Sequence, residues 1–236
     1  MASWIVHLRI AENLLAKFPE LDESQFAIGN IAPDSGLPDE KWEKFSPPIT
    51  VTHFCEDVWF STCSDLEFFR KYIQGLDLKT DSKRSSFLWG YFCHLVTDNL
   101  WNEIRESTYK KYKPEFDADK NFVWEVKDDW YGLDHVYVRE FPRSLFWRIF
   151  VDCGYQADYL DFLPEKNVQA RVDYIREFYQ RDDEEIRTII NRPFQYLSKA
   201  EMDRFVEIAS QKIESWLKKL QTEPTIYFDR NSLTQE

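Results

Sequence analysis

His94 and Asp98 stand four residues apart in a stretch that is otherwise rich in Leu, Val, Phe and Trp. In a helix this spacing places both side chains on the same face, one turn apart. A buried carboxylate without a partner is costly, so Asp98 needs a compensating group. A divalent cation would satisfy both side chains at once. A hydrogen bond between the two, or a surface pair at the edge of the helix, is the alternative.

Three further residues strengthen the metal hypothesis. The chain has only four His, and His7 and His53 are expected in the first turns of apolar helices. Asp34 follows Pro33 in a Pro-bounded segment that is typical of a loop. Taken singly, each would be an ordinary core His or turn Asp. Together with His94 and Asp98 they predict a site of imidazole nitrogens and carboxylate oxygens, which suit zinc and also accept iron or manganese.

His135, the remaining His, ends a run of acids and aromatics that begins at Asp128. It is a candidate metal ligand with Asp129 or Asp134 as helpers, or else a surface residue near a helix cap. Both interpretations stay open at this point.

The order of these motifs resembles the zinc-dependent phospholipase C family. An N-terminal His7 is followed by Gly-Asn-Ile-Ala-Pro-Asp at 29–34, Thr-His-Phe at 52–54 and Gly-Tyr-x-x-His-x-x-x-Asp at 90–98. The resemblance covers about the first 110 residues. It implies an all-α fold, similar to that of secreted single-strand nucleases, with metal ions held between helices.

The resemblance also implies which residues hold which metal ion. His53, His94, Asp98 and Asp34 would hold one metal ion, and Asp34 would bridge to a second ion bound by His7. Two such cations can activate water and stabilise a phosphoryl transition state. The implied activity is hydrolysis of a small phosphoester by a metal-bound hydroxide that Asp34 orients.

The sequence departs from the family pattern at three places. Secreted members use the amino group of an N-terminal Trp as a ligand, whereas Trp4 is internal here. Members also place a His one or two turns after the last Asp, where this chain has Asn102 and Ile104. A later His-x-x-x-Glu pair is replaced by His135 and Arg139. One or two ions, most simply zinc, are therefore expected rather than three.

Two rival functions remain. Another helical metallophosphohydrolase, such as an HD-domain enzyme, would need an adjacent His-Asp dyad, and Asp134-His135 has the reverse order. The other rival is a non-enzymatic helical protein whose degenerate site serves structure or partner binding.

Helices must position these residues, because apolar residues recur mostly at helical spacing. The pattern predicts a first helix at about 4–18 with Ser3 as its cap, a second from about 52 to 73, and a buried third at about 82–109. It predicts a loop with a little extended chain at 114–124. A helix interrupted near Pro142 is expected at 130–153, and two or three amphipathic helices at about 167–221.

Composition supports one all-α, multi-helix bundle domain at 1–222, followed by a polar, loose tail at 223–236. Of the 236 residues, 43% are hydrophobic and only six are Gly, which favours helices with few sharp turns. There is no apolar run long enough to span a membrane and no secretory signal, and the four Cys form no C-x-x-C pair. A cytoplasmic location is expected. The net charge of −12 disfavours binding to a nucleic-acid duplex.

Overall fold

The computed structural model describes residues 1–41, 44–56, 62–76, 81–154 and 158–235. The fold is all-α, as predicted, and its only sheet in the described residues is an antiparallel pair of two-residue strands. η1 is a 3₁₀ turn, and η2 and η3 are π-helical. In chain order the elements are α1 Trp4–Leu15, α2 Glu23–Gly29, η1 Ala32–Asp34, β1 Leu37–Pro38, β2 Phe45–Ser46, α3 Ile49–Thr52, α4 Asp65–Phe68, η2 Phe69–Ile73, α5 Ser82–Lys111, α6 Lys113–Ala118, α7 Phe122–Glu140, η3 Phe146–Phe150, α8 Glu165–Gln180, α9 Glu184–Asn191 and α10 Lys199–Thr222.

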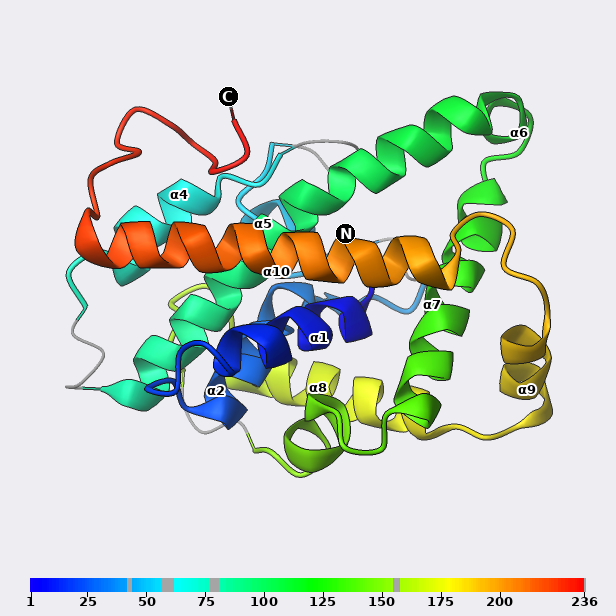
Figure 1. Cartoon of the computed structure of the whole chain (residues 1–236), viewed down its shortest axis with the longest axis horizontal. Coiled ribbons are helices and arrows are strands. Elements are labelled where there is room, and N and C mark those ends of the chain that lie inside the picture. Colours follow the sequence, from blue (N-terminus) through cyan, green and yellow to red (C-terminus); the bar gives the residue numbers. More distant parts are fainter. Residues whose placement is uncertain (42–43, 57–61, 77–80, 155–157, 236) are drawn as a thin grey trace.

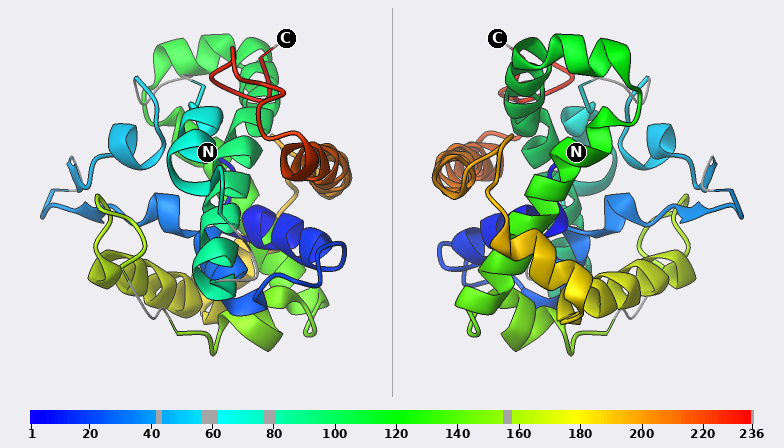
Figure 2. Two further views of the ribbon diagram at one scale, coloured as in Figure 1. Left: turned by 90° about the vertical axis from the view of Figure 1, so that its left-hand side faces the viewer. Right: turned by 90° about the vertical axis from the view of Figure 1, so that its right-hand side faces the viewer.

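Helix α5 is the central element, as its nearly all-apolar sequence predicts. Asp81 caps it by accepting a hydrogen bond from the Arg84 backbone N–H, and every residue from Ser85 to Asn99 is buried. Figure 1 shows α5 running through the molecule, with α1, α2 and α10 packed against it. Figure 2 shows α10 nearly end-on, beside α1 and α5. The buried half of α5 is the half that carries His94 and Asp98.

Helices α2 and α5 touch backbone to backbone at two glycines. A Cβ atom on Gly29 would lie 2.1 Å from the Phe87 carbonyl oxygen, and one on Gly90 would lie 2.3 Å from the Phe26 carbonyl oxygen. Only glycine fits where two helix backbones approach this closely. The contact brings the end of α2, and η1 after it, against the middle of α5.

The prediction of one continuous helix from about 52 to 73 is wrong. α3 ends at Thr52, and Phe54 follows with a φ of 52°, a left-handed conformation that a continuing helix cannot contain. Helical structure resumes at Asp65. Val58 and Trp59, which fall within the range predicted for this helix, lie outside the described residues. His53 is therefore the C-terminal cap of α3 and not a first-turn residue.

The loop predicted for 114–124 is also wrong. The chain forms α6 at 113–118 and enters α7 at Phe122. Pro114 lies in the first turn of α6, where a missing N–H has no helical partner to lose, so it starts a helix and does not break one. The first helix ends at Leu15 and not at Phe18, while the interrupted helix at 130–153 and the C-terminal helices are confirmed.

The C-terminal tail, expected to be loose, returns to the helical body. The Asp65 carboxylate accepts hydrogen bonds from Ser232 Oγ at 2.6 Å, from the Leu233 backbone N–H at 3.0 Å and from Asn99 Nδ2 at 2.7 Å. Ser232 and Leu233 are both buried. A buried carboxylate with several donors gives this segment a specific attachment point, and it ends beside the residue that follows Asp98.

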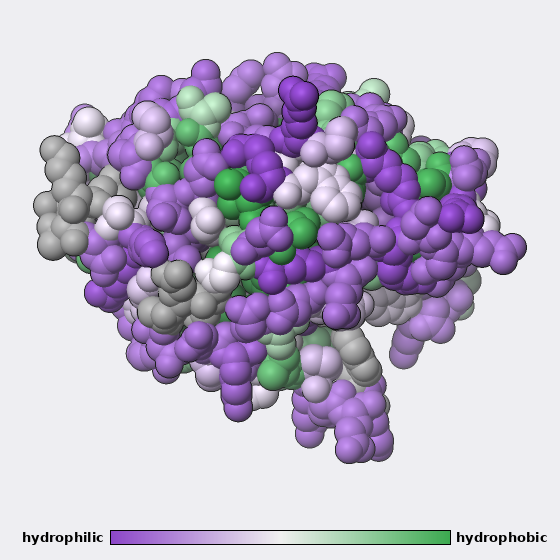
Figure 3. All heavy atoms as spheres, turned by 90° about the horizontal axis from the view of Figure 1, so that it is seen from below, coloured by the Kyte–Doolittle hydropathy of each residue, from purple (hydrophilic) through white to green (hydrophobic). Residues whose placement is uncertain are grey.

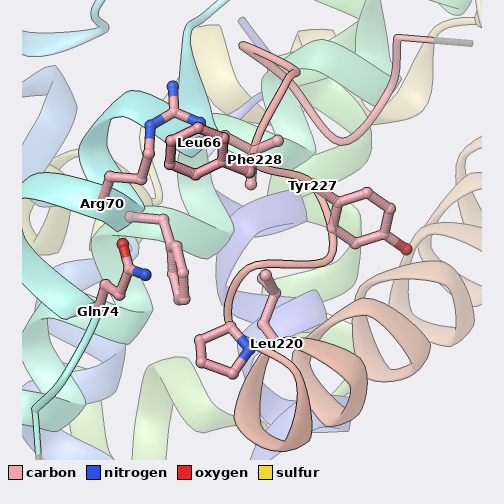
Figure 4. A pocket seen from close by; sticks show the side chains of 8 residues that line it. Leu66, Arg70, Gln74, Leu220, Tyr227 and Phe228 are labelled. Carbon is pink, nitrogen blue, oxygen red and sulfur yellow. The ribbon is translucent and has the colours of Figure 1, made fainter.

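No helix among the described residues has the length and apolarity that crossing a bilayer requires. Figure 3 shows the underside of the molecule as mainly hydrophilic, with hydrophobic side chains in separate small areas. Figure 4 shows a small pocket between α4, η2 and the chain that follows α10, lined by Leu66, Arg70, Leu220 and Phe228 among others. None of the predicted site residues lines this pocket.

Candidate metal centre

Five of the predicted site residues meet in the interior. His7 comes from α1, Asp34 from η1, His53 from the end of α3, and His94 and Asp98 from α5. The three imidazoles and the Asp98 carboxylate are at most 4% exposed, and the Asp34 side chain is 8% exposed. Residues that lie up to 91 positions apart in sequence thus converge on one point.

His94 lies at the centre of the cluster, and its environment fixes its tautomer. Its Nδ1 lies 2.8 Å from the Asn30 carbonyl oxygen, which can only accept, so Nδ1 carries the proton. Nε2 of the neutral ring therefore presents a lone pair. It faces the Asp98 Oδ2 at 3.4 Å and His53 Nε2 at 3.2 Å.

His53 is oriented in the same way. The Thr52 hydroxyl lies 3.0 Å from His53 Nδ1 and 3.4 Å from the Ile49 carbonyl oxygen. The hydroxyl donates to the carbonyl, so it accepts from Nδ1–H and leaves the lone pair on Nε2. The Tyr91 hydroxyl donates to the Thr52 carbonyl at 2.5 Å and holds this turn against α5. Two imidazole lone pairs 3.2 Å apart repel each other unless a proton or a metal ion lies between them.

Asp34 approaches the same two rings from η1. Its Oδ1 lies 3.4 Å from His53 Nε2 and 4.0 Å from His94 Nε2, while Oδ2 accepts a 2.8 Å hydrogen bond from Trp4 Nε1. One oxygen is thereby fixed by the indole and the other is directed at the imidazoles. Asp34, His53 and His94 each offer a ligand atom within 4.8 Å of the others.

His7 and Asp98 form the second side of the cluster. The His7 ring stacks on His94 with centroids 3.8 Å apart, and its Nε2 lies 3.4 Å from Asp98 Oδ1. That oxygen also accepts a 2.7 Å hydrogen bond from the Ala2 backbone N–H. Neither His7 nitrogen nor Asp98 Oδ2 has a hydrogen-bond partner within the described part of the chain. His7, His94 and Asp98 make a second group with ligand atoms within 4.8 Å.

The electrostatics of the cluster keep Asp34 and Asp98 ionised and His7 neutral. Burial alone would raise the pKa of both carboxyls. The His53 and His94 rings lower the pKa of Asp34 despite burial, and the amino terminus and His94 lower that of Asp98. Burial and the neighbouring His94 lower the pKa of His7 to about 4. The Asp98 and Asp34 carboxylates raise the pKa of His94 despite its burial, so a metal ion would take the place of a proton on that ring. Ionised carboxylates and deprotonated imidazole nitrogens bind a metal, so the donor set fits a divalent ion, zinc included.

The structure does not bring His135 to this cluster. It lies on α7 between Phe178 and Tyr179, with ring centroids 5.1 and 5.0 Å away, and its Nδ1 accepts a hydrogen bond from Arg139 at 3.3 Å. Its proposed helper Asp134 instead accepts from Ser3 Oγ at 2.8 Å, so Ser3 ties α1 to α7 and does not cap α1 through its side chain. Asp129, the other helper, binds Arg192.

The His135→Gln variant should keep the metal content of the wild type and reduce the acid sensitivity of folding. Burial and the charges of Arg139 and Arg181 lower the pKa of His135 to about 4. An unfolded His titrates near 6.5, so the unfolded chain takes up the proton first, and this group costs stability as pH falls from about 6.5 to about 4. Between pH 7.5 and 5, urea unfolding of chelated protein should lose about 1–2 kcal/mol less in the variant. A drop in bound metal on elemental analysis would instead make His135 a ligand.

The sequence alone did not identify the residues that orient the metal ligands. Asn30 and Thr52 belong to the motifs at 29–34 and 52–54, yet no role was assigned to them. Trp4 was considered only for its backbone amine, whereas its indole binds Asp34. For His53 the available signal was the hydroxyl residue Thr52 directly before it. Asn30 acts through its backbone carbonyl, which its residue type does not signal. The partners themselves depend on tertiary contacts.

The comparisons with known proteins agree with this geometry. Residues 6–116 match the family model described as zinc dependent phospholipase C. The matched segment contains all five converging residues and both glycines of the α2–α5 contact. No curated protein and no solved structure matches the chain.

Proposed function

We propose that this chain, which over residues 6–116 belongs to the zinc-dependent phospholipase C family, is a metal-dependent phosphoester hydrolase. The observation that carries the proposal is the buried meeting of His53 Nε2 and His94 Nε2, 3.2 Å apart, with Asp34 and Asp98 on either side. Two buried carboxylates around these rings need a compensating positive charge, which a divalent cation would supply. His7, Asp34, His53, His94 and Asp98 are the proposed ligands, for one or two ions.

A bound divalent ion would polarise a phosphoryl oxygen and lower the pKa of a water molecule. The chain itself supplies orientation. Asn30 and Thr52 hold the His94 and His53 rings with their lone pairs toward the centre. Trp4 fixes the Asp34 carboxylate through one oxygen, and Asp34 is the most exposed member of the set, so it is placed to accept a proton from attacking water.

A non-enzymatic role with a structural ion is the second candidate, and one observation favours it. The cluster is nearly enclosed, with His7 and His94 fully buried. Structural metal sites are closed, whereas catalytic sites keep an open position. The partial exposure of Asp34 and Trp4 is what favours catalysis.

Elemental analysis of protein purified without added metal tests the first step, and zinc, iron or manganese is the expected result. Chromogenic phosphate monoesters and diesters then test turnover. Asp34→Asn should lower kcat at least a hundredfold, the usual contribution of a positioned proton acceptor, while the group of His7, His94 and Asp98 stays intact. Glu40→Gln, which changes an exposed acid between β1 and β2, is the control. Metal without turnover on any phosphoester would favour the structural role.

A further inference from the structure

Helix α8 packs against η1, the element that carries Asp34. Two side chains of α8 bind the pair of short strands that follows η1. Asn167 Nδ2 donates to the Ser46 carbonyl oxygen of β2 at 2.6 Å. One turn further along α8, Arg171 Nη2 donates to the Gly36 carbonyl oxygen, just before β1, at 3.2 Å. The Arg171 guanidinium therefore contacts the chain two residues after Asp34.

The same guanidinium lies over Trp4. Its Cζ is 5.5 Å from the centre of the Trp4 ring and 5.5 Å from that of the Tyr174 ring. The Trp4 indole in turn donates to the Asp34 carboxylate at 2.8 Å. Asp34 and Trp4 are the partly exposed residues of the metal centre, so Arg171 lies on the side from which a substrate would approach.

Arg171 is a buried cation that has no carboxylate partner in the described part of the chain. The residue is 9% exposed, and its Nε is buried without a hydrogen-bond partner among those residues. Asp129, by comparison, is a buried acid that pairs with Arg192 at 2.9 Å. Burying an unpaired charge is costly, and the contacts with two ring faces offset only part of that cost. A bound oxyanion would supply the missing partner.

The position of the guanidinium also decides which substrate group these aromatic side chains can accept. Trp4 and Tyr174 meet edge to face with ring centroids 5.8 Å apart, and Arg171 lies over both. Aromatic faces attract cations, but a substrate ammonium placed here would be repelled by the charge of Arg171. An oxyanion would instead meet a planar fork of N–H donors that matches carboxylate and phosphate geometry.

We infer that Arg171 forms an anion-binding subsite beside the metal centre, and that the site takes a phosphoester with a second oxyanion, a carboxylate or a further phosphate. The metal centre holds the phosphoryl group that reacts, and Arg171 binds the second group. A zwitterionic head group, which has an ammonium in that place, does not fit. The inference rests on the proposed function, because it names the substrate class of that site.

Binding of hydrolysis-resistant phosphonates to the metal-loaded protein tests the subsite without turnover. Propylphosphonate has one anionic group, whereas 3-phosphonopropionate and propane-1,3-diphosphonate add a carboxylate or a second phosphonate at the far end. In titration calorimetry, the wild type should bind at least one of the two dianionic ligands about tenfold more tightly, since a charge-assisted contact is added. The tighter ligand identifies the second group. Equal affinity for all three ligands would overturn the inference.

Variants of Arg171 show whether that preference depends on the guanidinium. Arg171→Gln should reduce the ratio of the two affinities about tenfold, and Arg171→Lys should keep part of it, because the charge remains but the planar fork is lost. Arg176→Gln is the matched control, since Arg176 also lies on α8, donates to the Phe150 carbonyl oxygen at 3.0 Å and lies 6.0 Å from a ring centre, that of Phe150.

A purely structural role for Arg171 gives a different result. If the side chain only ties α8 to the strand pair, Arg171→Gln lowers Tm and weakens all three phosphonates by the same factor. The ratio of affinities then stays at its wild-type value, which would contradict the inference.

Turnover separates this inference from the proposed function. The phosphate monoester of 3-hydroxypropionate or the bisphosphate of propane-1,3-diol should be hydrolysed with a higher kcat/KM than propyl phosphate. Equal kcat/KM for all three esters overturns the inference and leaves the hydrolase intact. A preference in phosphonate binding that depends on Arg171, without hydrolysis of any ester, supports the subsite and contradicts the hydrolase.

Discussion

Replacing His94 with alanine is expected to abolish metal binding and turnover together. Its Nε2 belongs to both candidate ligand groups, so no complete group survives its loss. The variant also leaves Asp34 and Asp98 buried without the imidazole that holds their pKa values down. Metal that binds only the native state stabilises it by about 3 kcal/mol at a hundred times Kd, which is about 6–12 °C in Tm for a chain of this size. The variant should lose this metal-dependent rise in Tm, and chelation should remove the same rise from the wild type.

Elemental analysis and thermal unfolding with and without chelator check this expectation. His94→Gln preserves most of the side-chain volume and therefore controls for the loss of packing in the Ala variant. His135→Gln is the matched control, since His135 is equally buried but lies outside both groups. A His94 variant that folds, retains stoichiometric metal and turns over substrate would refute the site.

Gly90→Ala is expected to prevent folding or to destabilise the protein by more than about 3 kcal/mol, because overpacking here meets backbone and not a movable side chain. Its Cβ would lie 2.3 Å from the Phe26 carbonyl oxygen and 3.1 Å from the Asn30 backbone nitrogen. The two helices would have to separate. The Asn30 carbonyl, which orients His94, would move with α2.

Urea unfolding and metal content measure the two consequences. If the variant folds, its metal affinity should fall even though every ligand is present. Gly154→Ala is the matched control, because a Cβ at Gly154 meets nothing within 4 Å. Wild-type stability and metal content in Gly90→Ala would contradict the close approach of α2 and α5.

The sequence predicts an element correctly where local interactions form it and fails where long-range packing does. The buried helix that carries His94 and Asp98 was predictable almost to its ends, because an apolar run capped by Asp81 is a local signal. The break after His53 was not, since a positive φ at Phe54 is imposed by packing and not by its own preference. Pro114 was misassigned because proline both ends and begins helices, and its position in the turn decides which.

The candidate site shows the same division. His53 stands in the Thr-His-Phe motif, whereas the sequence leaves the role of His135 open and packing decides it. His53 is turned toward His94, while His135 is enclosed by Phe178 and Tyr179 of α8. The tail provides a second case, because its polar composition indicates a loose end, whereas one buried acid, Asp65, binds it.

The sequence by itself determined which residue types are present to bind a metal and that His94 and Asp98 share one helix face, because helical spacing is fixed by local geometry. The tertiary structure alone decided which distant residues join them and which partners orient their rings. Those contacts depend on how the helices pack, and the approach of α2 to α5 at Gly29 and Gly90 is a sum of many long-range interactions that no short stretch encodes.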